Sequence, residues 1–132
     1  MRKTLIICFL LLTMVVLWAE ADSEVDYTDP AELKNLIESQ DREYFLIDVR
    51  TPSEYDSGYI PTAVNIPFDV LADYLPTEHK EALIIVYCRS GNRSSIAYNT
   101  LADLGFENVV DFGGISRWQH ELMLPEKSAA NN

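Results

Sequence analysis

Cysteine and basic residues are both scarce in this chain. Cysteine occurs only as Cys8 and Cys88, and 10 lysines and arginines stand against 21 aspartates and glutamates, for a net charge of −11. An acidic protein of this kind repels nucleic acid and anionic lipid surfaces, so we expect neither as a partner. Histidine is limited to His79 and His120, which lie in no cluster with metal-ligand spacing. We therefore expect no metal and no cofactor.

A long apolar run occurs only near the N-terminus. Residues 5–18 are almost entirely apolar, follow two basic residues and precede a small-x-small triplet at 19–21. This order is typical of a secretory signal peptide, and the run is shorter than the roughly 20 residues of a membrane-spanning helix. We predict a signal peptide at 1–21 and a mature domain at 22–132, exported without stable membrane insertion after cleavage, and periplasmic if the host is bacterial. An uncleaved N-terminal anchor is the alternative.

Removal of that signal peptide would make Cys88 the sole thiol of the mature protein. Cys8 would leave with the cleaved segment, so no internal disulfide could form. Cys88 is then a buried inert side chain, a reactive thiol, or one half of a disulfide to another molecule.

Strand-like and helix-like segments alternate along the mature chain. Asp29 and Pro30 are typical of a helix start, with Asp29 as the N-cap. The apolar run 82–87 is typical of a central strand that is buried on both faces. The alternation predicts one α/β domain, with a mostly parallel central sheet flanked by helices. Further strands are expected at 44–49, 63–66 and 109–110, and a helical turn at 53–57. Helices are expected at 68–75 and from near Ser94 to Leu104, the latter with Ile96, Ala97, Leu101 and Leu104 on one face. A last helix is expected from Gly113–Gly114 onward, with Ile115, Trp118 and Leu122.

The polar segment after the strand at 82–87 combines a cysteine with anion-binding features. Ligands of parallel α/β sheets bind beyond the carboxyl ends of the strands, which is where Cys88 lies. Backbone N–H groups, the positive end of the following helix and two arginine side chains would all favour a thiolate and an anionic substrate, with Gly91 permitting the tight turn. We predict that Cys88 is a nucleophile in an anion-binding loop; a buried cysteine beside solvated arginines is the alternative. The loop residues assigned to substrate binding are Arg89, Ser90, Gly91, Asn92, Arg93 and Ser94.

The spacing between cysteine and arginine bears on the reaction. Protein tyrosine phosphatases and related enzymes carry Cys-x5-Arg, whereas position 94 of this chain is serine. The shorter ring from Cys88 to Arg93 suits a single sulfur atom on the cysteine better than a tetrahedral phosphoryl group. A phosphatase or an arsenate reductase is therefore the less favoured hypothesis.

The segment Cys-Arg-Ser-Gly-Asn-Arg-Ser at 88–94 resembles the active-site loop of the rhodanese-like sulfurtransferases. Tyr59 and Thr62 differ from the His and Gly of the family's Gly-His-Ile-Pro-Gly-Ala segment, which lies away from the sulfur chemistry. The similar segments follow the family's order and cover about residues 27–122. Beyond the loop they are Leu46–Arg50, Glu54–Tyr55, Gly58–Ala63, Leu104–Val109, and Gly113–Ile115 with Trp118.

The resemblance implies a rhodanese domain whose Cys88 takes a sulfane sulfur from thiosulfate or a similar small anionic donor. Sulfite would leave, and the Cys88 persulfide would pass its sulfur to cyanide or to a thiol acceptor. The amides of the loop and both of its guanidinium groups would stabilise these anions. Asp48 and Arg50 would organise the neighbouring loop. The alternative function is a persulfide carrier, or a sulfur-binding partner protein, with little turnover of its own.

Other residues near the loop receive structural interpretations. Ser94 either donates a hydrogen bond at the site or caps the helix that follows. Asn92 begins an N-glycosylation sequon, which we treat as coincidental because a glycan there would block the site. Tyr87 and Trp118 are expected in the core, and His79 in an exposed loop.

Overall fold

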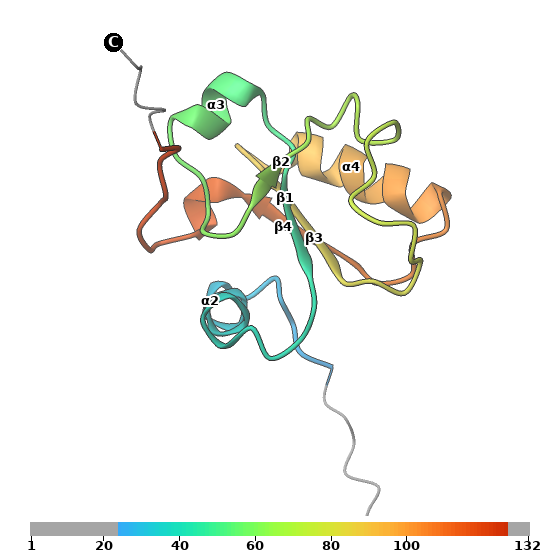
Figure 1. The fold of residues 1–132 in the computed structure, drawn as a ribbon, viewed down its shortest axis with the longest axis horizontal. Helices are drawn as coiled ribbons and strands as arrows, with labels where there is room; N and C mark the ends of the chain where they lie inside the picture. The colour runs from blue at the N-terminus through green and yellow to red at the C-terminus, as the bar shows by residue number, and fades with distance from the viewer. Residues whose placement is uncertain (1–23, 127–132) are drawn as a thin grey trace, which may run out of the picture.

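The computed structural model describes residues 24–126, so the predicted signal peptide at 1–21 lies outside the described residues. Within that range the strands form one sheet of four, in the order β2-β1-β3-β4, and every pairing is parallel. β1 and β3 lie in the middle of this sheet (Figure 1). The predicted α/β fold with a mostly parallel sheet is confirmed. The strands are β1 (Phe45–Asp48), β2 (Val64–Asn65), β3 (Ile84–Cys88) and β4 (Val109–Gly114).

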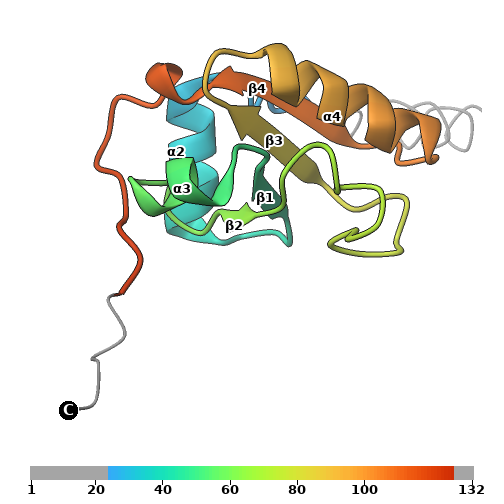
Figure 2. The same cartoon turned by 90° about the horizontal axis from the view of Figure 1, so that it is seen from above.

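Helices cover both faces of the sheet. α2 (Pro30–Ser39) lies on one face and α4 (Asn92–Asp103) on the other, as the views in Figures 1 and 2 show. Two short helices, α3 (Pro52–Asp56) and η2 (Ile115–Arg117), follow the carboxyl ends of β1 and β4. Because the strands are parallel, these short helices and the start of α4 meet at one edge of the sheet, where ligands of such folds bind.

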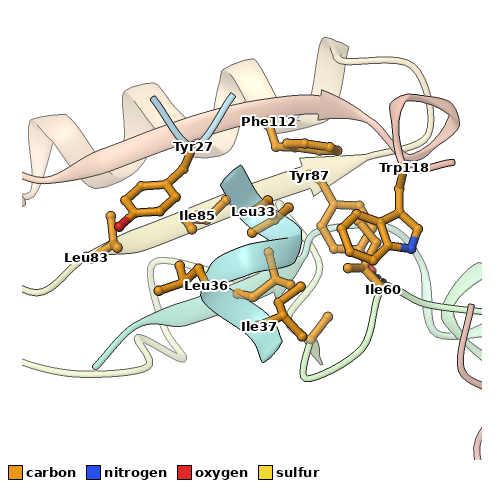
Figure 3. Close-up of a cluster of buried hydrophobic side chains, with 12 residues drawn as sticks. Tyr27, Leu33, Leu36, Ile37, Ile60, Leu83, Ile85, Tyr87, Phe112 and Trp118 are labelled. Carbon is orange, nitrogen blue, oxygen red and sulfur yellow. Dashed lines mark hydrogen bonds between the residues drawn. The ribbon is translucent and has the colours of Figure 1, made fainter. Parts of the chain in front are cut away.

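Strand β3 contributes to two hydrophobic cores, because successive side chains of a strand point to opposite faces. Ile85 and Tyr87 pack with α2 and with Phe112 in the cluster that Figure 3 shows. The alternate residues of β3, Cys88 among them, pack beneath α4 beside Ala97. All five residues of β3 are buried, which confirms the prediction of a central strand. Cys88 therefore lies on the α4 side of the sheet.

Two predicted helical segments have capped starts. The carboxylate of Asp29 accepts a hydrogen bond from the Ala31 amide at 2.8 Å, as the predicted N-cap of α2 should. The helical turn predicted at 53–57 is α3, in which Thr51 and Glu54 form a capping box. In that box each side chain accepts a hydrogen bond from the backbone N–H of the other residue, so α3 is stable despite its five residues.

The helix predicted at 68–75 is wrong. The segment makes successive turns, in which the Val70 amide donates to the Pro67 carbonyl at 3.1 Å, and two further amides bond to carbonyls three residues back. The hydrogen bonds of the segment reach carbonyls three residues back, so the four-residue spacing of an α-helix is not established there before Pro76. Its apolar spacing reflects packing, since Leu71 is buried in the core beneath α4.

The helix predicted from Gly113–Gly114 is also wrong. These two glycines end β4, and only the single 3₁₀ turn η2 follows. Trp118 is buried as predicted, but Leu122 is 39% exposed. β4 extends beyond the predicted 109–110 because its residues pair with β3 across a register shift, so the extra strand length depends on a neighbour far away in the sequence.

Helix α4 begins at Asn92 and is followed, as predicted, by Gly105 with φ of +90°. Its predicted apolar face is only partly correct. Ala97 and Leu101 are buried, whereas Ile96 is 50% exposed. Successive helical residues point about 100° apart, so Ile96 is rotated away from the sheet when Ala97 faces it. Leu104, at 39% exposed, likewise lies outside the buried face, which Ser94 joins instead.

Candidate active site

Cys88 is the last residue of β3, and the chain turns around its sulfur to enter α4. Its side chain is fully buried, and the amide of Gly91 donates a hydrogen bond to Sγ at 3.0 Å. Gly91 has φ of +103°, a left-handed conformation that glycine adopts without steric cost, and this turn aims its N–H at the sulfur. We call residues 88–94 the Cys88 loop.

Ser94 is the second close partner of the sulfur. It is fully buried, and its hydroxyl lies 3.5 Å from Sγ, where it accepts a hydrogen bond from the thiol. The same hydroxyl donates to the Gly91 carbonyl at 3.0 Å. The interpretation of Ser94 as a helix cap is wrong, because the N-cap of α4 is Gly91 and no side chain caps it. Ser94 instead contacts the sulfur from within the first turn of α4. When the thiol ionises, this hydroxyl is in position to donate to the thiolate.

The pKa of the Cys88 thiol lies below its ordinary value. Burial raises the pKa of this thiol, but hydrogen bonds from the Ser94 hydroxyl and from the amides of Ser94, Gly91 and Ser90 together lower it by more. The direction agrees with the prediction of an activated thiolate. The cause of the lowered pKa differs in part from the prediction. Backbone amides and one hydroxyl stabilise the Cys88 thiolate, whereas the sequence predicted that two arginines would contribute as well.

The end of β4 supports the Cys88 loop from below. A Cβ atom at Gly114 would lie 2.8 Å from the Arg89 carbonyl oxygen and 3.2 Å from the Cα of Ser90. Only glycine allows the loop backbone to approach the strand this closely. Gly113–Gly114, which the sequence suggested as a helix start, is thus part of the packing of the site.

The two arginines of the loop have different surroundings. Arg89 is exposed, as are Ser90 and Asn92. Arg93 instead forms a bidentate ion pair with Glu54, with guanidinium-to-carboxylate distances of 2.7 and 2.9 Å. Two of the donors of Arg93 are therefore already bound to a carboxylate, and the role of both guanidinium groups toward an anion stays a prediction.

Glu54 is the residue of the site that sequence reasoning missed. The sequence places it only within a segment similar to the family's, and it is 39 positions from Arg93. Hydrogen bonds from Arg93 are the main reason that the pKa of Glu54 is lowered to about 2. The Thr51-x-x-Glu54 pattern was a readable signal for the capping box, but nothing local pointed to the ion pair.

Asp48 and Arg50 form a buried ion pair beneath the site. The Arg50 guanidinium donates to both carboxylate oxygens of Asp48, at 2.6 to 3.0 Å, and to the Gly58 carbonyl at 2.7 Å. These contacts connect the end of β1 to the residues on both sides of α3. The pair thereby holds the segment that carries Glu54, and its role in organising the loop of the site stays a prediction.

Two other sequence features are placed by the structure. His79 is exposed, as predicted. The sequon begins at Asn92, the first residue of α4, and its serine is fully buried against Cys88. Among residues 24–126, no three His, Cys, Asp or Glu side chains gather closely enough to hold a metal ion. Over the same range, no helix has the length and apolar character needed to cross a bilayer.

Comparison with known proteins identifies the family. The sequence model of the rhodanese-like domain matches residues 29–121. The chain belongs to the rhodanese-like family. A solved structure, a rhodanese-like domain protein from Staphylococcus aureus, superposes with a TM-score of 0.65 at 32% identity, covering 74% of this chain and 95% of that one. The expected rhodanese fold is therefore confirmed.

Relatives of similar size are sulfurtransferases by name. YtwF of Bacillus subtilis, provisionally named a sulfurtransferase, is 37% identical over 98 residues, which cover 74% of this chain and 94% of that protein. A mitochondrial protein of Schizosaccharomyces pombe, provisionally named a thiosulfate sulfurtransferase, is 30% identical over 127 residues, covering 85% and 89%. The adenylyltransferase and sulfurtransferase Uba4 of Ogataea parapolymorpha is 38% identical over 87 residues, but this chain spans only 22% of its length. The relatives that this chain matches over most of their length are thus sulfurtransferases by their provisional names.

Proposed function

We propose that this rhodanese-like protein is a thiosulfate sulfurtransferase that carries the transferred sulfur as a persulfide on Cys88. The observation that carries the proposal is the Gly91 amide directed at Sγ at 3.0 Å, in a loop that lowers the pKa of the thiol. A buried thiolate stabilised by hydrogen bonds is a nucleophile that is available near neutral pH.

The first half-reaction forms the persulfide. The Cys88 thiolate attacks the outer sulfur of thiosulfate, a new S–S bond forms at Sγ, and the donor's S–S bond breaks with its electron pair leaving on sulfite. Charge balances, because a thiolate and a dianion become a persulfide anion and a dianion. The negative charge moves one sulfur atom outward from Sγ, toward the exposed part of the Cys88 loop.

The second half-reaction returns the enzyme to its starting state. Cyanide attacks the outer sulfur of the persulfide and forms thiocyanate, and the electron pair of the broken S–S bond returns to Cys88 as a thiolate. A thiol acceptor follows the same course and leaves as a persulfide. The Gly91 amide and the Ser94 hydroxyl, which contact Sγ, are positioned to stabilise the thiolate that departs from the sulfur in this step.

Two features support thiosulfate as the donor class. One relative of similar length carries thiosulfate sulfurtransferase in its provisional name. The Arg89 side chain is exposed at the loop, where a small anion would arrive. We also propose, from the pattern at residues 1–21, that the protein is exported and that its partners are a small anionic sulfur donor and a thiol or cyanide acceptor.

The test is thiosulfate:cyanide turnover by the wild-type protein and by Cys88→Ser, together with the intact mass after exposure to thiosulfate. We expect thiocyanate formation and the gain of one sulfur atom by the wild type, and neither by the variant. A persulfide without turnover would instead identify a carrier. No gain of sulfur by the wild type would refute sulfur transfer through Cys88.

A further inference from the structure

A fixed negative charge lies beside the anion-binding loop. Both terminal nitrogens of the Arg93 guanidinium are bound to the carboxylate of Glu54, one to each oxygen. The side chains of this pair are only about a quarter exposed, at 25% for Arg93 and 26% for Glu54. The charge of one of the two arginines in the loop is therefore largely neutralised before any substrate arrives.

Glu54 is held in place independently of Arg93. The Thr51 amide and the Thr51 hydroxyl both donate to Glu54 Oε2 at 3.0 Å, the same oxygen that Arg93 contacts at 2.7 Å. α3 itself is restrained through the Arg50 contacts to Asp48 and Gly58. The carboxylate is thus a built part of the site, and its pKa of about 2 keeps it ionised throughout the physiological range.

Arg93 lies five residues after Cys88 in the same loop, in the first turn of α4. Its pKa is raised chiefly by the hydrogen bonds with Glu54, and the charges of Glu54 and of the Cys88 thiolate contribute in the same direction. A change in how Arg93 is neutralised would therefore be felt by Cys88 and by any anion that approaches it.

We propose that Glu54 is a positioning residue that sets donor selectivity, by neutralising Arg93 and so limiting the advantage of doubly charged donors over less charged ones. This inference rests on the proposed sulfur transfer through Cys88. The Glu54 carboxylate repels an incoming anion and occupies two donors of Arg93. Its removal makes Arg93 a free cation, and the resulting gain in attraction grows with the charge of the donor.

The effect is graded by donor charge, which separates it from a general change in the site. Coulomb energy is proportional to the charge of the ligand, so the factor gained by a dianion is the square of that gained by a monoanion. For one unit of charge at the edge of a solvated site at physiological salt, we expect an increase in kcat/KM of about fourfold for thiosulfate and about twofold for the monoanion methanethiosulfonate.

The variant that tests this is Glu54→Gln. Glutamine preserves the capping box of α3, because either Glu or Gln at the third helical position of that motif can accept the hydrogen bond from the N-cap amide. The local fold is therefore retained. The matched control is Glu38→Gln, which removes a carboxylate that is paired with Lys34 on α2. Glu38 is near the end of α2, which leads to the start of β1, whereas Cys88 is at the carboxyl end of β3. We expect the control to leave both donors unchanged.

A second readout does not require turnover. Iodoacetate is anionic and iodoacetamide is neutral, and both alkylate the same thiolate, so the ratio of their rates measures the charge felt at Cys88. We expect Glu54→Gln to raise this ratio about twofold, and Glu38→Gln to leave it unchanged. If the wild type forms no persulfide, the proposed function fails while this ratio still decides the role of Glu54. An unchanged or lower ratio, or an equal change of kcat/KM for both donors, would overturn the inference.

Discussion

The Ser94 hydroxyl offers the sharpest test of how the thiolate is stabilised. It is fully buried, lies 3.5 Å from Sγ and donates to the Gly91 carbonyl in the thiol form. In Ser94→Ala the thiolate loses this donor. The Gly91 carbonyl does not become an unsatisfied buried acceptor, because it still accepts from the Ser95 amide at 3.1 Å. The substitution therefore removes one stabilising contact and leaves the turn intact.

The size of the effect follows from the exchange of hydrogen bonds on ionisation. A hydrogen bond to a charged group contributes about 1.5 to 3 kcal/mol, and turning toward the sulfur gives up a neutral bond to Gly91 of about 1 kcal/mol. The net loss in Ser94→Ala is therefore about 1 kcal/mol, or about a fivefold lower ratio of thiolate to thiol. Because the anion is the destabilised form, the pKa of Cys88 rises and the pH profile moves toward higher pH.

The assay is the rate of alkylation by iodoacetamide across the pH range, followed by intact mass. Below the pKa of the thiol, Ser94→Ala should react about fivefold more slowly than wild type, with an unchanged plateau at high pH. Ser95→Ala changes the exposed neighbour and should retain the wild-type profile. A profile that stays in place, or that moves to lower pH, would show that the Ser94 hydroxyl does not stabilise the thiolate.

Two further predictions concern the packing of the loop and the N-terminus. Gly114→Ala should lower the free energy of unfolding by about 1 to 3 kcal/mol and move the alkylation profile to higher pH, because the new methyl group displaces the Arg89 carbonyl and with it the loop. Gly105→Ala is the control: nothing lies within 4 Å of the added Cβ, but φ is +90°, so this variant should lose stability in denaturant titration while its alkylation profile stays that of the wild type. Equal alkylation profiles for the two variants would contradict the packing role of Gly114. When the full chain is expressed in a bacterial host, the periplasmic fraction should contain a mature protein that begins after residue 21, and an uncleaved mass in the membrane fraction would favour the anchor.

The sequence predicted the fold where the local pattern and the final environment agree. The run 82–87 is apolar at every position, and β3 is buried on both faces because α2 and α4 cover them. The segment 68–75 has helical spacing but forms successive turns between two prolines, and of its apolar residues only Leu71 is fully buried. Periodicity predicted that Leu71 faces the core, with Phe68 and Leu75 packed beside it, but it was wrong for Tyr74, which is 67% exposed, and it could not predict the hydrogen-bond pattern of the segment.

The contiguous part of the site could also be predicted. Cys88, Gly91 and Ser94 lie within one strand-to-helix turn, so a short stretch of sequence determines their contacts. The supporting contacts come from elsewhere in the chain. Gly114 approaches the loop only because β4 pairs with β3, and Glu54 reaches Arg93 only because α3 follows the neighbouring strand β1. A pattern within one segment contains no information about such contacts.

The Glu54–Arg93 pair separates two roles that the sequence had combined in the arginines. The thiolate is favoured by the Gly91 amide and the Ser94 hydroxyl, which lie at short range within a buried site. Such contacts are little affected by dissolved salt or by distant charges. Under the proposed function, capture of an anionic donor would depend instead on the net charge near the exposed loop, which the Glu54 carboxylate lowers. A protein with a net charge of −11 can therefore keep an anionic nucleophile without a strongly cationic site, because its acidic surface acts on the approach of the donor far more than on the ionisation of the buried sulfur.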